Sequence, residues 1–290
     1  MRKIYRLTGA PKSFIRWKEA NKQKIEAMVN SENHTGNTIW SFFRNFEKVY
    51  KELKSTLVQD QGYICCYCGQ RIFSDIHTSI EHVEPKESEK KLTLDFDNLL
   101  ASCDGGSNHR CHLVKKGETL ISIADLYGVD VEHLEEVYIK IDEIEVFRKK
   151  YDIENLSAGD RIVIFPKSAK NEQHCDIRKG KKTIDIHPLL DGCSSFFRYS
   201  ETDGLIVVTE ANRKTVECLG LNDNPLLNRL REKSLIKADS IKRQLITDFG
   251  SSPSQFRLNR ERVISKFEKV QKAGDKLDSF AFVILWSLKK

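Results

Sequence analysis

The segment Cys65-Cys66-Tyr67-Cys68-Gly69 restricts the possible folds of this chain more than any other feature. The thiolates of Cys65 and Cys68, three residues apart and followed by a small residue, can occupy two corners of a tetrahedral zinc site. Cys66 has the wrong spacing to join them, so we expect it to be a buried or incidental thiol. A single Cys-x-x-Cys pair is also compatible with a redox centre or with plain thiols. A zinc site therefore requires a second pair of ligands elsewhere in the chain.

The composition is that of a soluble globular protein, with 290 residues, of which 39% are hydrophobic and 31% charged. The amino-terminal residues have a basic start but no apolar signal core, and nowhere do about 18 apolar residues follow one another. We therefore expect a cytoplasmic protein without a membrane span. In such a protein the eight cysteines are metal ligands or buried thiols rather than a disulfide framework.

Charge is distributed unevenly along the chain. Residues 112–166 contain twelve acidic and seven basic side chains, a net charge of −5. Because the whole chain has a net charge of +6, the remaining residues carry a net charge of +11. A basic body with one acidic segment is typical of a nucleic-acid-binding protein that carries a passenger domain. The alternative is an ordinary solvated surface, and basicity alone does not distinguish the two.

Apolar periodicity predicts helices at both ends of the chain. Within residues 1–60, aromatic and aliphatic residues recur at steps of three and four, which is the period of an amphipathic helix. Two further helices are predicted at about 225–249 and 255–287. The stretch from Arg229 to Lys290 holds fifteen basic and seven acidic residues, so this helical region could contact DNA or a protein partner. Residues 184–208 are apolar and β-like, and Cys193 and Cys218 lack partners at ligand spacing.

The segment Glu81-His82-Val83-Glu84-Pro85 carries the strongest signal of chemistry. We predict strands at 71–73 and 79–83 that form a β-hairpin. Adjacent strand residues point to opposite faces, so Glu81 and His82 cannot do the same task, and one can hold a metal while the other faces a water molecule. Asn98 follows His82 after a segment long enough for a loop, so we predict that a helix starts near Asn98. Cys103 lies shortly after it.

These motifs together resemble the HNH endonuclease subunit of the Septu anti-phage systems, which is also found beside some retrons. The matching segments are CCYCGQRI, IEHVEPKE, LDFDNLLASCDGG, HCDIRKGKK, DIHPLL and FFRYSETDG. The resemblance implies an α+β fold: a zinc-stapled HNH nuclease core of the ββα-metal type with helices at both ends. It also implies a DNA endonuclease that acts as the effector subunit beside an SMC-like ATPase.

An internal block, residues 112–168, does not match that family and instead looks like a LysM domain of βααβ order. Thr119 is placed to cap its first helix and Gly128 to end that helix. LysM domains elsewhere bind N-acetylglucosamine glycans, but fold does not dictate function, and we expect an acidic passenger or a docking element here. The expected regions are 1–60 (helical), 61–111 (nuclease, first part), 112–168 (insertion), 169–220 (nuclease, second part) and 221–290 (basic helices).

The resemblance assigns the site residues. His82 is the expected general base, and Asn98 orients it or binds metal. His174 and Glu81 are the expected ligands of a catalytic Mg²⁺ or Mn²⁺ ion. A structural Zn²⁺ is expected on Cys65, Cys68, Cys103 and Cys175, since the sequence after Cys175 matches the nuclease, with Cys111 as the alternative fourth ligand.

Two other functions remain compatible with the sequence. One is a non-catalytic adaptor, in which the zinc site is a scaffold and the LysM-like block senses a ligand. The other is a nuclease directed at RNA, because a basic groove and a metal ion do not distinguish the two sugars.

Overall fold

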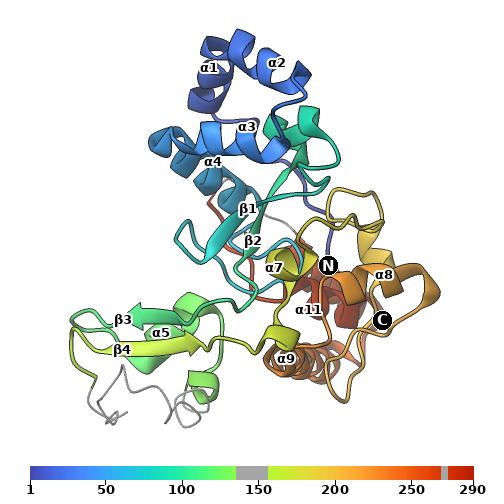
Figure 1. Cartoon of the computed structure of the whole chain (residues 1–290). Helices are drawn as coiled ribbons and strands as arrows, with labels where there is room; N and C mark the ends of the chain where they lie inside the picture. Colours follow the sequence, from blue (N-terminus) through green and yellow to red (C-terminus); the bar gives the residue numbers. More distant parts are fainter. Residues whose placement is uncertain (135–155, 269–273) are drawn as a thin grey trace.

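The computed structural model describes residues 1–134, 156–268 and 274–290. It combines helices with two small antiparallel sheets, so the α+β class is confirmed. Figure 1 shows helices α1–α4 on one side of the β1–β2 sheet, the β3–β4 sheet at another side, and the carboxyl-terminal helices near the amino terminus. None of the helices in these described residues is both long and apolar enough to cross a membrane.

Four helices form the amino-terminal region, as the periodicity of residues 1–60 predicts. They are α1 (Lys12–Ala20), α2 (Lys22–Asn30), α3 (Gly36–Arg44) and α4 (Glu47–Asp60). Aromatic rings join them: the Trp17 ring lies 4.7 Å from that of Phe43 and 5.2 Å from that of Phe46, between ring centroids. The Thr35 side chain accepts a hydrogen bond from the Thr38 backbone and so caps α3.

The central hairpin differs from the prediction. Strand β1 (Thr78–His82) pairs antiparallel with β2 (Leu99–Cys103), with Thr78 opposite Cys103 and His82 opposite Leu99. The predicted strand 71–73 is wrong, because the knuckle turn after Cys65 leaves Arg71 a single bridge to Ile64. The helix predicted after Asn98 is also wrong. That chain passes through the 3-10 turns η1 (Lys90–Leu94) and η2 (Phe96–Asn98), and the apolar run that follows is buried as β2.

The insertion contains β3 (Arg110–Leu113), α5 (Leu120–Tyr127) and β4 (Arg161–Phe165), with β3 and β4 antiparallel. Both predicted helix boundaries are confirmed, since the Thr119 side chain accepts from the Ser122 backbone and Gly128 ends α5 with φ +64°. Most of the predicted second helix and the spacer lie outside the described residues.

The two ends of the insertion lie side by side. The Ser168 backbone N–H donates to the Gly106 carbonyl at 2.8 Å, and the His174 N–H donates to the Gly105 carbonyl at 3.1 Å. A side chain at Gly106 would collide with Ser168, because a β-carbon there would lie 2.3 Å from the Ser168 hydroxyl. The chain therefore leaves the core and returns to it through one narrow neck, after which η3 (Lys170–Glu172) leads into α7 (Cys175–Lys179).

Because the two ends of the insertion are neighbours, we predict that the insertion can be removed without disturbing the rest of the fold. Replacing residues 107–167 by a short Gly/Ser linker leaves Cys103 and Cys175 in place, because Gly106 and Ser168 are already hydrogen-bonded neighbours. We expect the shortened chain to keep one zinc per molecule, measured by elemental analysis, with the helical circular-dichroism signal of the remaining residues. Loss of zinc from a soluble shortened chain would show instead that the insertion holds the cysteines together.

The remaining elements are η4 (Cys193–Phe196), α8 (Glu210–Cys218), α9 (Pro225–Phe249), α10 (Pro253–Glu268) and α11 (Ala281–Lys289). The helix predicted at 225–249 is confirmed. The second predicted helix is two helices, α10 and α11, since residues 274–280 are not helical. Helix α11 is buried against α9 and α10, with Ala281 and Val283 fully enclosed. In the β-like segment 184–208, the described pairing is a single bridge between Tyr199 and Ile206.

Candidate active site and metal centre

Four cysteine sulfurs converge at the centre of the molecule. The sulfurs of Cys65, Cys68, Cys103 and Cys175 all lie within 4.8 Å of one another, and all four residues are buried. The Cys65–Cys175 and Cys68–Cys103 sulfur pairs are each 3.8 Å apart. A tetrahedral zinc ion with Zn–S bonds of about 2.3 Å requires sulfurs about 3.8 Å apart. The four residues therefore fit one structural zinc ion.

The cluster draws its ligands from three separate segments. Cys65 and Cys68 come from the turn before β1, Cys103 ends β2, and Cys175 begins α7. The expected alternative, Cys111, is not a member, because it lies in β3 of the insertion and is only half-buried. Cys66 is also outside the cluster, and burial raises the pKa of its thiol well above the usual value, so it remains protonated.

His174 lies beside the sulfur cluster. Its Nδ1 atom is 3.1 Å from the Cys175 sulfur and 3.9 Å from the Cys103 sulfur. The sequence analysis expected His174 to share a metal ion with Glu81, but among the described residues these two side chains form neither a hydrogen bond nor an ion pair with each other. The backbone conformation explains this difference. His174 precedes α7 in an extended conformation, with φ −140° and ψ −179°, so its side chain faces the cysteines. The residues of α7 itself face Glu81.

The residue of α7 that meets Glu81 is Asp176, which the sequence analysis missed. The two carboxyl groups share a hydrogen bond. Burial and the adjacent Glu81 carboxylate raise the pKa of Asp176 to about 9, because a second negative charge is unfavourable there. At neutral pH Asp176 therefore keeps its proton. The sequence did contain a signal that could have identified Asp176. Asp176 and Lys179 are three residues apart and therefore share one face of a short helix.

Two other groups hold the Glu81 carboxylate. Its Oε1 atom accepts a hydrogen bond from the Tyr67 hydroxyl at 2.9 Å and pairs with the Lys179 ammonium at 2.8 Å. Burial acts to raise the pKa of Glu81, but the contacts with Asp176, Lys179 and Tyr67 outweigh it and lower the pKa. Tyr67 lies between the two knuckle cysteines, so the zinc turn itself positions this carboxylate.

These contacts predict the effect of Tyr67→Phe. The substitution keeps the buried ring and removes one hydrogen bond to an ionised group, which costs about 1.5–3 kcal/mol. We expect the free energy of unfolding, measured in urea on zinc-loaded protein, to fall by that amount. Tyr63→Phe is the matched control, since the Tyr63 hydroxyl makes no hydrogen bond among the described residues. Equal stability of the two variants would contradict the role of the Tyr67 hydroxyl.

His82 is adjacent to Glu81 in β1 and points to the opposite face, as expected for neighbouring strand residues. Its Nε2 atom is 3.0 Å from the Thr93 carbonyl oxygen, and its ring packs edge-on against Trp40 with centroids 4.6 Å apart. A carbonyl only accepts hydrogen bonds, so Nε2 carries the proton and Nδ1 has a free lone pair. Burial, with the nearby Lys86 charge, lowers the pKa of His82 to about 4.

Asn98 closes the loop that carries Thr93. Its amide donates to the Glu84 carbonyl at 3.0 Å and the Leu92 carbonyl at 3.1 Å, and its oxygen accepts from the Glu84 N–H at 2.8 Å. Both ends of the side chain are thus engaged with backbone. Of the two expected roles, orienting His82 or binding metal, this geometry favours an orienting role that acts through the loop.

The fold and the site define an α+β protein with a four-thiolate centre. His174 lies beside this centre, and the carboxyl pair of Glu81 and Asp176 lies on the adjoining helix and strand. The LysM domain model matches residues 112–137, which confirms a LysM domain there. The chain is also 33% identical over 89 residues to the retron Ec83 putative HNH endonuclease of Escherichia coli. That similarity covers 28% of this chain and 34% of the relative, so it links the chain to an HNH endonuclease over part of its length.

Proposed function

We propose that this protein is a metal-dependent HNH endonuclease that hydrolyses DNA. The observation that carries the proposal is the buried carboxyl pair of Glu81 and Asp176 on one face of β1, together with His82, whose Nδ1 atom has a free lone pair on the other face. Carboxylate oxygens are the ligands that Mg²⁺ and Mn²⁺ prefer. A divalent ion bound by this carboxyl pair would displace the proton that Asp176 holds in the metal-free protein and would compete with Lys179 for Glu81. Once bound, it would stabilise the negative charge that develops on the phosphate during hydrolysis.

Other residues of the site activate the attacking water and hold the proposed base in position. His82 is neutral at physiological pH because its pKa is about 4, so its Nδ1 atom can accept the proton of an attacking water. The Thr93 carbonyl fixes the ring through Nε2, and Asn98 fixes the loop that presents this carbonyl. Lys179 donates to the His82 carbonyl at 2.8 Å and also pairs with Glu81. It therefore ties the base and the proposed ion site to one helix.

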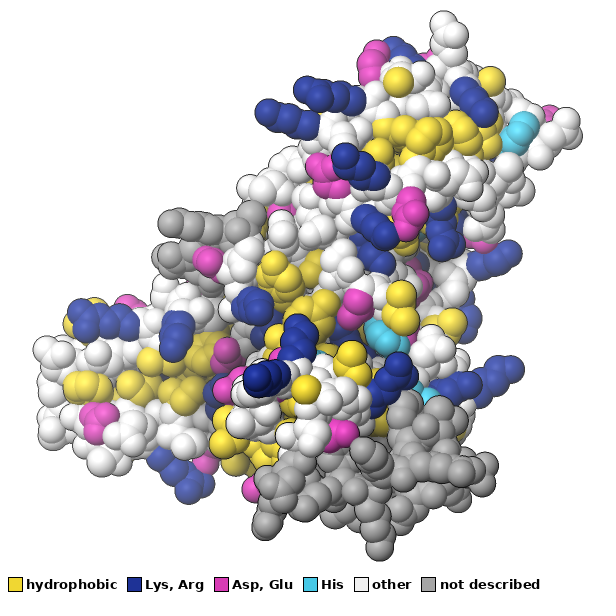
Figure 2. Space-filling model, turned by 90° about the vertical axis from the view of Figure 1, so that its left-hand side faces the viewer, with side chains coloured by type: hydrophobic (Ala, Val, Ile, Leu, Met, Phe, Trp, Pro, Cys, Tyr) yellow, Lys and Arg dark blue, Asp and Glu magenta, His cyan; other side chains and the backbone are white. Residues whose placement is uncertain are grey.

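The surface charge supports a polyanionic substrate. On the face shown in Figure 2, Lys and Arg side chains extend from the amino-terminal helices to the middle of the molecule, with acidic side chains among them. Lys181, two residues after Lys179, is exposed. Such side chains bind phosphates without reading sequence, so they favour a nucleic acid and do not separate DNA from RNA.

We further propose that the protein is the effector of an anti-phage system of the Septu type, acting with an SMC-like ATPase. The similarity to a retron HNH endonuclease supports a role in such a system. An unrestrained nuclease would damage the DNA of its own cell, so a partner is expected to direct it. Plasmid cleavage by the isolated chain at the same rate as by the complex would contradict that control.

The cleavage test uses plasmid DNA and a matched RNA, with Mg²⁺ or Mn²⁺, and wild-type protein with and without the co-purified partner. Cleavage of DNA that EDTA abolishes is the expected result. Cleavage of RNA alone would favour the RNA-directed alternative. No cleavage under any of these conditions, by protein that still contains zinc, would reject the nuclease and favour the adaptor.

The pKa of His82 also predicts the pH profile. A base with a pKa of about 4 stays almost entirely neutral between pH 8 and pH 6. A histidine of ordinary pKa, about 6.5, would be only about a quarter neutral at pH 6. We therefore expect no fall in cleavage rate from loss of the base across this range, measured at metal concentrations that saturate at each pH. A fourfold fall under those conditions would indicate a base of ordinary pKa.

A further inference from the structure

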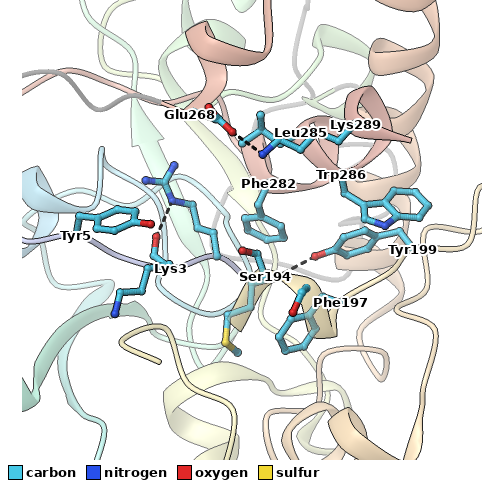
Figure 3. Close-up of a pocket in the computed structure, with 13 residues that line it drawn as sticks. Lys3, Tyr5, Ser194, Phe197, Tyr199, Glu268, Phe282, Leu285, Trp286 and Lys289 are labelled. Carbon is cyan, nitrogen blue, oxygen red and sulfur yellow. Dashed lines mark hydrogen bonds and ion pairs between the residues drawn. The ribbon is translucent and has the colours of Figure 1, made fainter. Parts of the chain in front are cut away.

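A cavity lies on the side of Phe282 where the amino terminus and helix α11 meet, and the Phe282 ring packs against Gly69 of the knuckle. This cavity has a volume of about 560 Å³, within the usual range for small-molecule sites. The chain segment 1–5, the turn η4, the end of α10 and helix α11 form its walls, and none of them carries a residue of the candidate active site. Figure 3 shows Tyr5 on one side of this cavity and Phe282, Trp286 and Tyr199 on the other.

Five of the thirteen residues that line the cavity are aromatic: Tyr5, Phe197, Tyr199, Phe282 and Trp286. The Tyr199 ring lies 5.5 Å from that of Trp286 and 6.1 Å from that of Phe282, between centroids. Tyr5 is 65% exposed, so its ring is available to a ligand. Aromatic faces attract planar rings by stacking and by burial of apolar area. This arrangement favours a flat ring system over a sugar or an extended aliphatic chain.

Among the described side chains of the cavity, the Arg2 guanidinium is the cation without a carboxylate partner, while the Met1 amino group donates to the Tyr199 hydroxyl at 3.0 Å. Lys289 pairs with Glu268 at 2.5 Å, and Lys3 pairs with Asp191 at 2.8 Å. Arg2 has no carboxylate within ion-pairing distance among the described residues, and its Nε atom donates a hydrogen bond to the Lys3 carbonyl at 3.3 Å. The terminal guanidinium nitrogens thus remain free for a ligand, and their fork geometry matches phosphate or carboxylate oxygens.

Burial makes that unmatched charge costly. The half-buried position of Arg2 lowers the pKa of its guanidinium, chiefly through loss of contact with water. An anion in the cavity would restore part of the lost solvation. The Ser194 hydroxyl also faces this cavity and makes no hydrogen bond among the described residues. It can donate to a base edge or to a phosphate oxygen.

We propose that this cavity is a binding site for a nucleotide, with the base between Tyr5 and the aromatic wall of Phe282 and Trp286 and the phosphate on Arg2. A nucleoside monophosphate has the required combination of a planar ring and one anionic group. The site is separate from the proposed nuclease centre, so the two proposals stand or fall independently.

Isothermal titration calorimetry on the full-length, zinc-loaded chain tests the proposal. Any tag is removed before the titration, because residues 1–5 and Lys289 all line the cavity. The probes are AMP, GMP, CMP and UMP, with adenosine and inorganic phosphate as half-ligands. We expect saturable binding of at least one nucleotide, with one site per chain and a Kd on the order of 10–100 µM. Each half-ligand should bind at least tenfold more weakly.

Two variants locate the ligand. Arg2→Gln should weaken nucleotide binding at least tenfold and leave adenosine binding unchanged, because adenosine lacks the phosphate. Arg16→Gln is the matched control, since Arg16 is exposed on α1 and outside the cavity. Trp286→Leu should weaken both the nucleotide and adenosine. If Trp286→Leu does not fold, the comparison of Arg2→Gln with wild type is sufficient, because the Arg2 side chain is not part of the core. Absence of saturable binding by all four nucleotides, or equal affinity for Arg2→Gln and wild type, overturns the proposal.

Discussion

Cys65→Ser is expected to unfold the centre of this protein. A closed structural zinc site contributes on the order of 10 kcal/mol to the fold that it joins, and here it connects the knuckle, the end of β2 and the start of α7. Loss of one thiolate therefore releases α7 together with Asp176 and Lys179. Elemental analysis should find well under one zinc per chain, and the cooperative thermal transition of the wild type should disappear.

Cys218→Ser is the matched control for this experiment. Cys218 is also buried but lies outside the sulfur cluster, so this variant should keep its zinc and its transition. A chelator strong enough to remove zinc should reproduce the Cys65→Ser result in wild type. If Cys65→Ser retained full zinc and stability, the four sulfurs would not be the metal site.

His82→Ala is expected to abolish most of the cleavage without disturbing the fold. Removing a general base typically lowers the rate by about 10²–10⁴-fold. The zinc centre does not involve this side chain, so zinc content should equal that of wild type. The rate is measured on supercoiled plasmid under single-turnover conditions with saturating Mn²⁺. His34→Ala is the control histidine, because His34 lies in the loop before α3, away from the proposed base.

The companion variant Asp176→Asn separates the base from the ion site. It replaces a carboxyl group, which can give up its proton to the proposed ion, by an amide that cannot, whereas His82→Ala leaves the carboxyl pair intact. Mn²⁺ binding in the absence of DNA should therefore weaken in Asp176→Asn and persist in His82→Ala. Unchanged Mn²⁺ affinity in Asp176→Asn, with wild-type affinity measurable, would remove Asp176 from the ion site.

The local chemistry of this chain follows from its sequence. The Cys-x-x-Cys spacing defines a metal knuckle, the Thr119 and Gly128 pair defines the limits of one helix, and the alternation of Glu81 and His82 separates their faces. Each of these depends on neighbours within a few residues, so spacing and backbone preference are sufficient. The helix at 225–249 was predictable for the same reason, since its apolar period and Asn224 cap are local.

The tertiary structure decided which distant residues meet. His174 and Asp176 are two positions apart, and the sequence favoured the histidine as the partner of Glu81, but the extended backbone before α7 turns His174 to the sulfurs and Asp176 to the carboxylate. Cys111 and Cys175 had similar sequence contexts, and the pairing of β3 with β4 placed Cys111 in the insertion. Such choices depend on contacts across about 70 to 110 residues, where burial and packing outweigh any local signal.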